Sequence, residues 1–291
     1  MSQVLNELVD LLSLEKIEEN LFRGRSQDLG WGQVYGGQVL GQALSAAAKT
    51  VEDDRFVHSL HAYFLRPGDV DRPIVYDVDR IRDGRSFTTR RVVAIQGGRP
   101  IFNLSASFQI DEEGFTHQLE MPGAPAPQEL SSDRERLQQM GTPLPAFMRK
   151  QAEAERSFEL RDVNPLDDPI APSVGDPASM HWLRATGELG DDPSLHRYLL
   201  AYASDFKFLV TSLRPHGVTW LTPGMQVASI DHAMWFHRPF RVDQWLLYVI
   251  DSPSAHGARG FVRGKIYDQQ GHLVASTSQE GLIRNRGERR P

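Results

Sequence analysis

The sequence predicts an α+β protein built from two similar halves, each a helix followed by an antiparallel sheet. One observation is a motif that recurs about 172 residues further along the chain: residues 59–67 read SLHAYFLRP and residues 231–239 read DHAMWFHRP. A second observation is that GRSFTTR at 84–90 parallels GARGFVR at 257–263, each followed by a strand, a turn and another strand. Because order and spacing are both preserved, we interpret the halves as a duplicated domain.

A helical pattern precedes the strands of each half. Residues 36–48 (GGQVLGQALSAAA) are mostly small, so this helix can lie very close to a sheet that wraps around it. Residues 1–19 alternate Leu and Val with polar residues and predict an opening amphipathic helix. In the second half, large apolar residues recur at helical spacing at Leu195, Leu199, Tyr202, Phe206 and Leu209.

Long strands follow both helices. We expect them at 73–81, 87–96, 100–109, 245–252, 260–267 and 273–282. Gly97-Gly98 and Gly271 mark hairpin turns, because glycine accepts the positive φ that such turns need. The mixed alternation of apolar and polar residues suits an antiparallel sheet with one covered face.

The middle of the chain differs from both halves in composition. Segment 121–127 (MPGAPAP) is proline-rich, and 130–157 is charged with an expected helical part. We therefore predict an N-terminal domain at 1–112, a connector at 113–180 packed in part on the body, and a C-terminal domain at 181–291 with the candidate catalytic residues. A helix followed by a curved antiparallel sheet, present twice in one chain, is the layout of a double hotdog fold.

Composition narrows the function classes. The formal net charge of −6 argues against a nucleic-acid binder. The chain has no cysteine, which excludes disulfides, thiolate metal sites and a cysteine nucleophile. No stretch approaches the roughly 20 apolar residues that span a bilayer, and the N-terminus lacks a signal-peptide layout, so we expect a cytoplasmic protein. Arginines cluster at 80–82, 90–91 and 259–263, either as solvated strand edges or as a patch for an anionic ligand.

Asp205 is the first candidate for chemistry. It lies in LLAYASDFKFLV (199–210), a mostly apolar segment that we expect to be helical. A carboxylate among aromatic residues risks desolvation, which raises its pKa unless partners compensate. Two interpretations stay open: a solvent-facing residue paired with Lys207 or Arg197, or a general base that faces the sheet.

Ser229 and Gln279 are the other polar candidates. Ser229 lies just before the aromatic strand of the second motif, and Gln279 lies on the final strand. Either could be an ordinary hydrogen-bonding residue of a strand. We reject a Ser229, Asp231, His232 triad, because alternate side chains of one strand share a face and His232 would then point away from Ser229. The chain also lacks the Gly-x-Ser-x-Gly elbow of serine hydrolases.

Histidines and glycine-rich segments give weaker signals. His58 with His61, and His232 with His237, match no established metal spacing, so we expect neither a metal nor a cofactor. Residues 30–32 (GWG) lack the third glycine of a dinucleotide-binding loop.

These residues sit in stretches that together resemble the bacterial acyl-CoA thioesterase II (TesB-type) family. The stretches are EKIEE (15–19), GGQV (36–39), YFLRPG (63–68), YASD (202–205), IDHAMWFHRP (230–239) and ARGFVR (258–263). The resemblance runs from Leu5 to Arg284. It implies a double hotdog fold and hydrolysis of medium- to long-chain fatty acyl-CoA to a free fatty acid and CoA.

The resemblance also implies a catalytic trio. Carried over by local motif, its members are Asp205, which ends YASD, Ser229, two residues before Asp-His, and Gln279, which precedes Glu-Gly. The family often has threonine where this chain has Ser229, and both supply one hydroxyl. Chemically, Asp205 can accept a proton from water while Ser229 and Gln279 hold this water. The thioester carbonyl also needs donors, such as backbone N–H groups near a helix start, which the sequence does not identify.

Acyl-CoA is the implied partner, and a homodimer or homotetramer is expected. Candidates for contacts with substrate or CoA are Arg259, Arg263, His237 and Arg238. Under the repeat offset, Val57 matches Ser229, and Ala106 or Gln109 lies near Gln279, so we expect one site per chain. Two other classes stay open: a hydratase, dehydratase or acyl-transfer enzyme of the same fold, and an acyl-CoA binder without turnover.

Overall fold

The computed structural model describes residues 2–140, 148 and 153–287. The first half contains α1 (Gln3–Leu12), β1 (Glu15–Glu18), β2 (Leu21–Gly24), α2 (Gly36–Ala48), β3 (Arg55–Phe64), β4 (Ile74–Asp83), β5 (Phe87–Gln96) and β6 (Arg99–Ile110). The middle segment contributes η1 (Pro127–Glu129), α3 (Asp133–Gln139) and β7 (Phe158–Asp162). The second half contains β8 (Ala178–Ala185), α5 (Pro193–Ala203), η2 (Leu209–His216), β9 (Met225–Ser229), β10 (Asp231–Phe236), β11 (Leu246–His256), β12 (Arg259–Asp268) and β13 (Leu273–Asn285).

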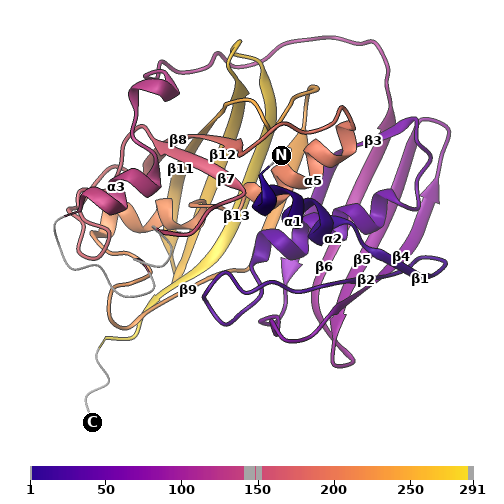
Figure 1. Ribbon diagram of the computed structural model, residues 1–291, viewed down its shortest axis with the longest axis horizontal. Coiled ribbons are helices and arrows are strands. Elements are labelled where there is room, and N and C mark those ends of the chain that lie inside the picture. The colour runs from indigo at the N-terminus through magenta and orange to yellow at the C-terminus, as the bar shows by residue number, and fades with distance from the viewer. Residues whose placement is uncertain (1, 141–147, 149–152, 288–291) are drawn as a thin grey trace.

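The described strands form one continuous antiparallel sheet (Figure 1). The strand order is β1-β2-β4-β5-β6-β3-β10-β13-β12-β11-β8-β7, and β9 pairs with β13. The halves join edge to edge where β3 pairs with β10, with Ala233 opposite His61. Each half therefore hides its otherwise open edge against the other, which removes two unpaired strand edges from solvent. This arrangement confirms the predicted double hotdog fold.

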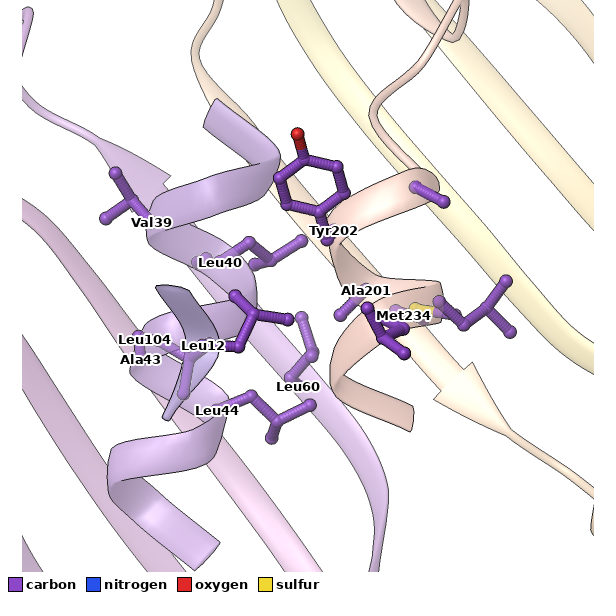
Figure 2. Packing of buried hydrophobic residues seen from close by; sticks show 14 of the residues in the cluster. Leu12, Val39, Leu40, Ala43, Leu44, Leu60, Leu104, Ala201, Tyr202 and Met234 are labelled. Carbon is purple, nitrogen blue, oxygen red and sulfur yellow. The ribbon is translucent and has the colours of Figure 1, made fainter. Parts of the chain in front are cut away.

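Helices α2 and α5 lie together against the sheet, and both contribute to one apolar core (Figure 2). Leu40 and Leu44 of α2 and Leu60 of β3 are fully buried in this core. The small residues of α2 allow a close approach to α5 as well as to the sheet. A side chain at Gly37 would overlap the carbonyl oxygen of Tyr202, and one at Gly41 would lie 3.1 Å from that of Tyr198.

The opening helix is shorter than the sequence pattern predicts. It starts with Ser2, whose Oγ accepts a hydrogen bond from the backbone N–H of Leu5, and it ends at Leu12. The residues after it form β1 and β2, a short hairpin at the sheet edge. The buried residues of α1 are Leu5, Leu8, Leu11 and Leu12, so the apolar face of the helix ends at Leu12.

The second helical pattern also ends earlier than predicted. Helix α5 stops at Ala203, and Lys207 adopts a left-handed φ of 55°, which an α-helix cannot contain. Asp205 therefore lies in the turn after α5 and not within a helix. Lys207 reaches Asp133 at 2.6 Å and Asp162 at 2.8 Å, and these contacts tie the turn to α3 and β7.

The middle segment covers the outer face of the second half. Trp182, Trp245, Leu247 and Tyr267 form a second apolar cluster with Met121, Ala124 and Leu130 packed on it. The segment also extends the sheet, because β7 pairs with β8. The predicted boundary at residue 181 falls within β8 (Ala178–Ala185), and the domain bounds stay a prediction. Of the predicted helix in 130–157, α3 accounts for 133–139, and residues 141–147 and 149–152 lie outside the described part of the chain.

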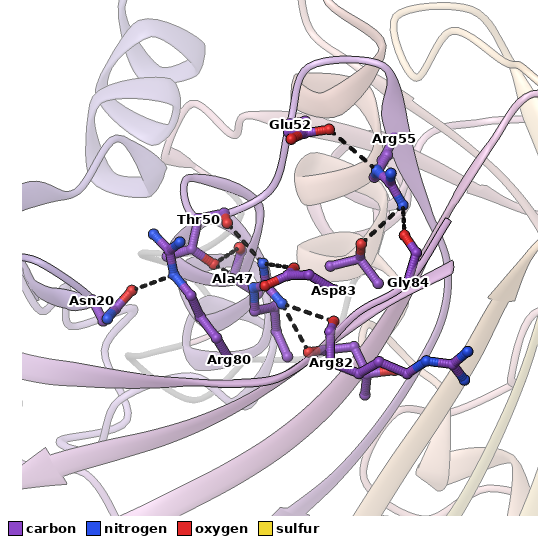
Figure 3. Close-up of polar contacts among 12 residues, drawn as sticks. Asn20, Ala47, Thr50, Glu52, Arg55, Arg80, Arg82, Asp83 and Gly84 are labelled. Atoms are coloured by element: carbon purple, nitrogen blue, oxygen red, sulfur yellow. Dashed lines mark hydrogen bonds and ion pairs between the residues drawn. The ribbon is translucent and has the colours of Figure 1, made fainter. Parts of the chain in front are cut away.

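Part of the arginine clustering has a structural explanation. Arg90 is 1% exposed and donates to the side chain and carbonyl oxygen of Thr50 just beyond α2, and it pairs with Asp83. Figure 3 labels these two partners, Thr50 and Asp83. Arg91 pairs with Asp79 at the surface. Arg90 is therefore neither a solvated residue of a strand edge nor part of a surface patch for an anionic ligand. Its buried guanidinium group links the end of α2 to the sheet.

Candidate active site

The structure brings the three sequence-predicted residues together. Nε2 of Gln279 donates to Oδ1 of Asp205 at 3.1 Å, and Oγ of Ser229 donates to the same oxygen at 3.4 Å. The second contact is long for a hydroxyl donor, so it is the weaker of the two. Ser229 ends β9 opposite Gly281 of β13, two residues beyond Gln279 on the same strand. Strand pairing thus places both donors on the side of the sheet that Asp205 faces.

The N-terminus of α2 forms the other side of the site. The backbone N–H of Gly37 lies close enough to the Asp205 carboxylate to lower its pKa. A Cβ at Gly36 would lie 2.7 Å from Oδ2 of Asp205 and 3.1 Å from the ring of Phe64, so only glycine fits there without displacement. The positive end of the α2 dipole also favours the charged carboxylate. Tyr35, the residue before α2, makes no side-chain cap bond, and the Asp205 carboxylate of the other half lies against this helix start.

The electrostatics of Asp205 combine opposing effects. The residue keeps some solvent exposure, but the protein around its carboxyl group desolvates it and raises its pKa from 3.8 to about 6. The hydrogen bonds from Gln279, Ser229 and Gly37 lower the pKa and so limit this rise. At neutral pH the group is mainly a carboxylate, and it is more basic than an ordinary aspartate. Of the two interpretations left open by the sequence, a pairing with Lys207 is wrong, because Lys207 contacts other carboxylates.

His232, which the sequence excludes as a triad member and as a metal ligand, lies beside the trio. It is fully buried, and its Nε2 lies 3.0 Å from Oγ of Ser204, the residue before Asp205. Burial lowers its pKa to about 4, so the ring is neutral at neutral pH. Contrary to the single strand predicted from the sequence, Ser229 and His232 lie on separate strands, β9 and β10, which break at Ile230. They still form no triad, because His232 bonds to Ser204 and Ser229 bonds to Asp205.

Comparisons with known proteins bear on this geometry. The family model described as acyl-CoA thioesterase matches residues 153–282, and the acyl-CoA thioesterase N-terminal domain matches residues 26–109. Acyl-CoA thioesterase 2 of Haemophilus influenzae is 46% identical over 98% of this chain and 99% of its own. The chain belongs to the acyl-CoA thioesterase family.

Other members of the family agree in sequence and structure. Human acyl-coenzyme A thioesterase 8 is 42% identical over 94% of this chain and 88% of its own. The crystal structure of acyl-CoA thioesterase II TesB2 from Mycobacterium marinum superposes with a TM-score of 0.79 at 42% identity, over 96% of this chain and 98% of that chain.

The candidate CoA contacts of this thioesterase are not gathered at the trio. Arg263 makes two hydrogen bonds of 2.9 Å to Asp251 on the outer face, and Arg259 bonds to Glu280 at 2.8 Å. His237 bonds to Ser276, and Arg238 donates to the carbonyl oxygen of Leu273. Leu273 is six residues before Gln279, which is about 20 Å along a strand. A role of these four side chains toward CoA stays a prediction.

The first half of the thioesterase has no second trio at the equivalent place. In β3 and β6, Leu60 pairs with Ala106, and Gln109 lies opposite Phe56 further along. The register therefore selects Ala106 as the counterpart of Gln279. In the described part of the chain, no group of three or more His, Asp or Glu side chains is arranged to hold a metal ion, and no helix is long and apolar enough to cross a membrane.

Proposed function

We propose that this member of the acyl-CoA thioesterase family hydrolyses medium- to long-chain fatty acyl-CoA with a water molecule that Asp205 activates. Hydrolysis of an acyl-CoA thioester is the reaction of the family, and the residue roles and the chain length are the finer parts of the proposal. The observation that carries it is one carboxylate oxygen that receives an amide donor and a hydroxyl donor from two different strands. Its pKa of about 6 suits a general base at neutral pH.

The donors leave groups free to hold the water. Gln279 uses one of its two amide hydrogens on Asp205, and the second can donate to the water oxygen. The oxygen of Ser229 can accept a hydrogen from the same water while its own hydrogen stays on Asp205. Both contacts orient a lone pair of the water toward the thioester carbon. The water and the thioester then react from fixed positions and need not meet by diffusion.

The reaction balances without any other group. Asp205 takes a proton from the water while the water oxygen attacks the carbonyl carbon. The C–S bond of the resulting tetrahedral intermediate then breaks. CoA leaves as a thiolate, which takes the proton back from Asp205, and the fatty acid is released. A thiolate is a good leaving group, so no covalent enzyme intermediate is required. Backbone N–H groups in the first turn of α2, beside Asp205, are the donors that we expect for the carbonyl oxygen.

Aromatic residues around the carboxylate support an acyl substrate. Tyr35 and Phe206 stack with ring centroids 5.0 Å apart, and the ring of Phe64 approaches Gly36. Such walls suit an alkyl chain better than a polar group. Assays of CoA release with acyl chains from two to eighteen carbons test this, and kcat/KM is expected to rise from acetyl-CoA toward the medium and long chains. A maximum at acetyl-CoA would contradict the substrate range.

A hydratase built on Asp231 and His232 is not favoured. Oδ1 of Asp231 accepts the backbone N–H of Glu280 at 2.6 Å, whereas His232 lies on the opposite face of β10 with Ser204. An acyl-CoA binder without turnover is distinguished by single-turnover hydrolysis. We further propose a cytoplasmic enzyme that forms a homodimer or homotetramer, which sedimentation at working concentrations tests.

A further inference from the structure

His232 and Gln279 lie opposite one another on neighbouring strands. The ladder between β10 and β13 pairs Ala233 with Ser278 and Met234 with Thr277, so its next antiparallel step pairs His232 with Gln279. Both side chains are 0% exposed and both point to the inner face. Side chains directly opposite in such a ladder have Cβ atoms about 5 Å apart and are in contact.

Each of these two residues has a buried atom that needs a partner. Among the residues that the structure describes, Nδ1 of His232 and Oε1 of Gln279 are buried without a hydrogen bond that meets standard geometry. A buried polar atom left without a partner costs about 1–3 kcal/mol. The Gln279 side chain lies close enough to the imidazole to oppose the fall of the His232 pKa. A small adjustment therefore lets each atom become the partner of the other.

The proton positions follow from Gln279. Its Nε2 donates to Asp205, so its Oε1 faces the other way and can only accept. The donor must then be Nδ1–H of His232, and in a neutral ring Nε2 becomes an acceptor. Oγ of Ser204 lies 3.0 Å from this Nε2 and is the donor that the proposed tautomer requires. In the structure this hydroxyl donates its one hydrogen to the carbonyl oxygen of Ala201 at 2.9 Å, so the proposed tautomer requires that hydrogen to turn from Ala201 to His232.

We propose that His232 is a positioning residue of the hydrolytic site: its Nδ1–H holds Oε1 of Gln279, and this fixes the amide with Nε2 toward Asp205 and the water. The proposal rests on the proposed function, since it assumes that Gln279 acts in hydrolysis. Without this contact the amide could turn over. Its oxygen would then face the carboxylate, and the donor to both Asp205 and the water would be lost.

The duplicated half argues that this pair is not needed for the fold. At the equivalent ladder position of the first half, Leu60 lies opposite Ala106, and both are buried. An apolar pair therefore satisfies the same architecture. The polar pair occurs in the half that carries the trio. Burying a neutral imidazole costs more free energy than burying leucine, so the fold alone does not favour histidine at this position.

Two near-isosteric variants separate the proposed contact from packing. The amide nitrogen of asparagine can take the place of Nδ1, whereas that of glutamine takes the place of Nε2. His232→Asn is expected to stay within a few-fold of the parental kcat. His232→Gln and His232→Leu are expected to lose about 10- to 100-fold in kcat with little change in KM, the scale of losing a group that orients a functional side chain. His61→Leu, on the opposite face of neighbouring β3, is the control and is expected to retain the parental rate.

The pH profile gives a readout that packing alone would not change. Gln279 lowers the pKa of Asp205, so an amide that is no longer fixed lets this pKa rise. The acid limb of kcat should therefore move to higher pH in His232→Leu and His232→Gln but not in His232→Asn or His61→Leu. In a Gln279→Ala background, His232→Leu should add little further loss, because both changes remove the same contact.

Three results would overturn the inference: equal losses in the asparagine and glutamine variants, an unmoved acid limb, or losses that add fully in the double variant. If His232→Leu fails to fold, the comparison of asparagine with glutamine still decides. If Gln279→Ala itself keeps the parental rate, the proposed function fails. If Gln279→Ala is slow while His232→Gln is as fast as the parent, the positioning role alone fails.

Discussion

At the scale of single residues, the site depends on one carboxyl group under two opposing influences. Desolvation raises the pKa of Asp205 to about 6, and donors from Gln279, Ser229 and Gly37 keep it from rising further. A base with a pKa just below neutral pH is mostly charged and still accepts a proton readily. The same donors fix its orientation, so the basicity and the position of this group have a common origin.

The pH dependence of kcat/KM follows from this pKa. Below about pH 6 Asp205 is protonated and cannot accept a proton from water, so the rate should fall as the pH decreases through this value. The limb should lie well above the usual aspartate value of 3.8. A pH series of CoA release, with enzyme stability checked at each pH, measures it. A rate that stays constant as the pH falls from 7 to 4.5 would contradict the assignment of the base.

Substitutions at Ser229 test the hydroxyl. Ser229→Thr keeps the hydroxyl and should retain most of the activity. Ser229→Ala removes it and should lower kcat by about 10- to 1,000-fold, the scale of removing one positioned polar group at a reacting centre. Steady-state hydrolysis of decanoyl-CoA compares the variants. An alanine variant as active as the parent would leave Ser229 without a role in the reaction.

At the scale of elements, the site is assembled by the meeting of α2 with the turn after α5. The two helices come from different halves, and glycines at the start of α2 let the backbone approach Asp205 and Tyr202. A helix N-terminus has N–H groups without partners in its own helix, and one of them reaches the carboxylate here. The first half therefore contributes a backbone donor to a site whose side chains lie in the second.

Gly36→Ala tests this approach. The added methyl would lie 2.7 Å from Oδ2 of Asp205, so the carboxylate must move away from Gln279 and Ser229. We expect kcat to fall by about 100-fold, as small displacements of reacting groups do, while thermal unfolding changes little. Gly123→Ala is a matched control, because no atom lies within 4 Å of the added methyl. Parental kcat in Gly36→Ala would show that the close approach is not needed.

Periodicity predicted most elements but not their ends. Helix α2 and the strands β5 and β6 agree with the predicted ranges to within a residue. Burial alternates along the two strands, whereas α2 is buried throughout from Gly37 to Ala47. The end of α5 was missed, since apolar residues continue at helical spacing to Leu209 while Lys207 turns the backbone. The break at Ile230 was missed for a similar reason, because both sides of it favour strand.

At the scale of the whole molecule, a duplicated fold supports a single specialised site. The joined sheet and the paired helices are shared by both halves, whereas the polar residues occur in the second half alone at the compared ladder positions. The trio could be predicted through the family motifs. The contact between His232 and Gln279 could not, because the sequence does not give the register of β10 against β13.

A mechanism that uses one carboxylate and water needs no metal ion. Treatment with a chelator such as EDTA, followed by removal of the chelator, should leave the rate of acyl-CoA hydrolysis unchanged. The assay is CoA release before and after treatment, with metal content measured in parallel. Loss of activity that a divalent cation restores would contradict the mechanism.

The replacement of Asp205 by asparagine tests the central claim most directly. It keeps the size of the side chain and removes the basic oxygen. Because the folded-state pKa is raised above that of the unfolded chain, the charged carboxylate destabilises the fold at neutral pH, and its removal should stabilise the protein by the order of 1–3 kcal/mol. Asp79→Asn, at an exposed position of β4, is the matched control.

CoA release from decanoyl-CoA is followed with a thiol reagent, and the protein has no cysteine to add background. The account predicts that Asp205→Asn lowers kcat by at least about 100-fold with KM and folding retained, while the control keeps the parental rate. A folded Asp205→Asn enzyme that hydrolyses decanoyl-CoA at nearly the parental rate would contradict it.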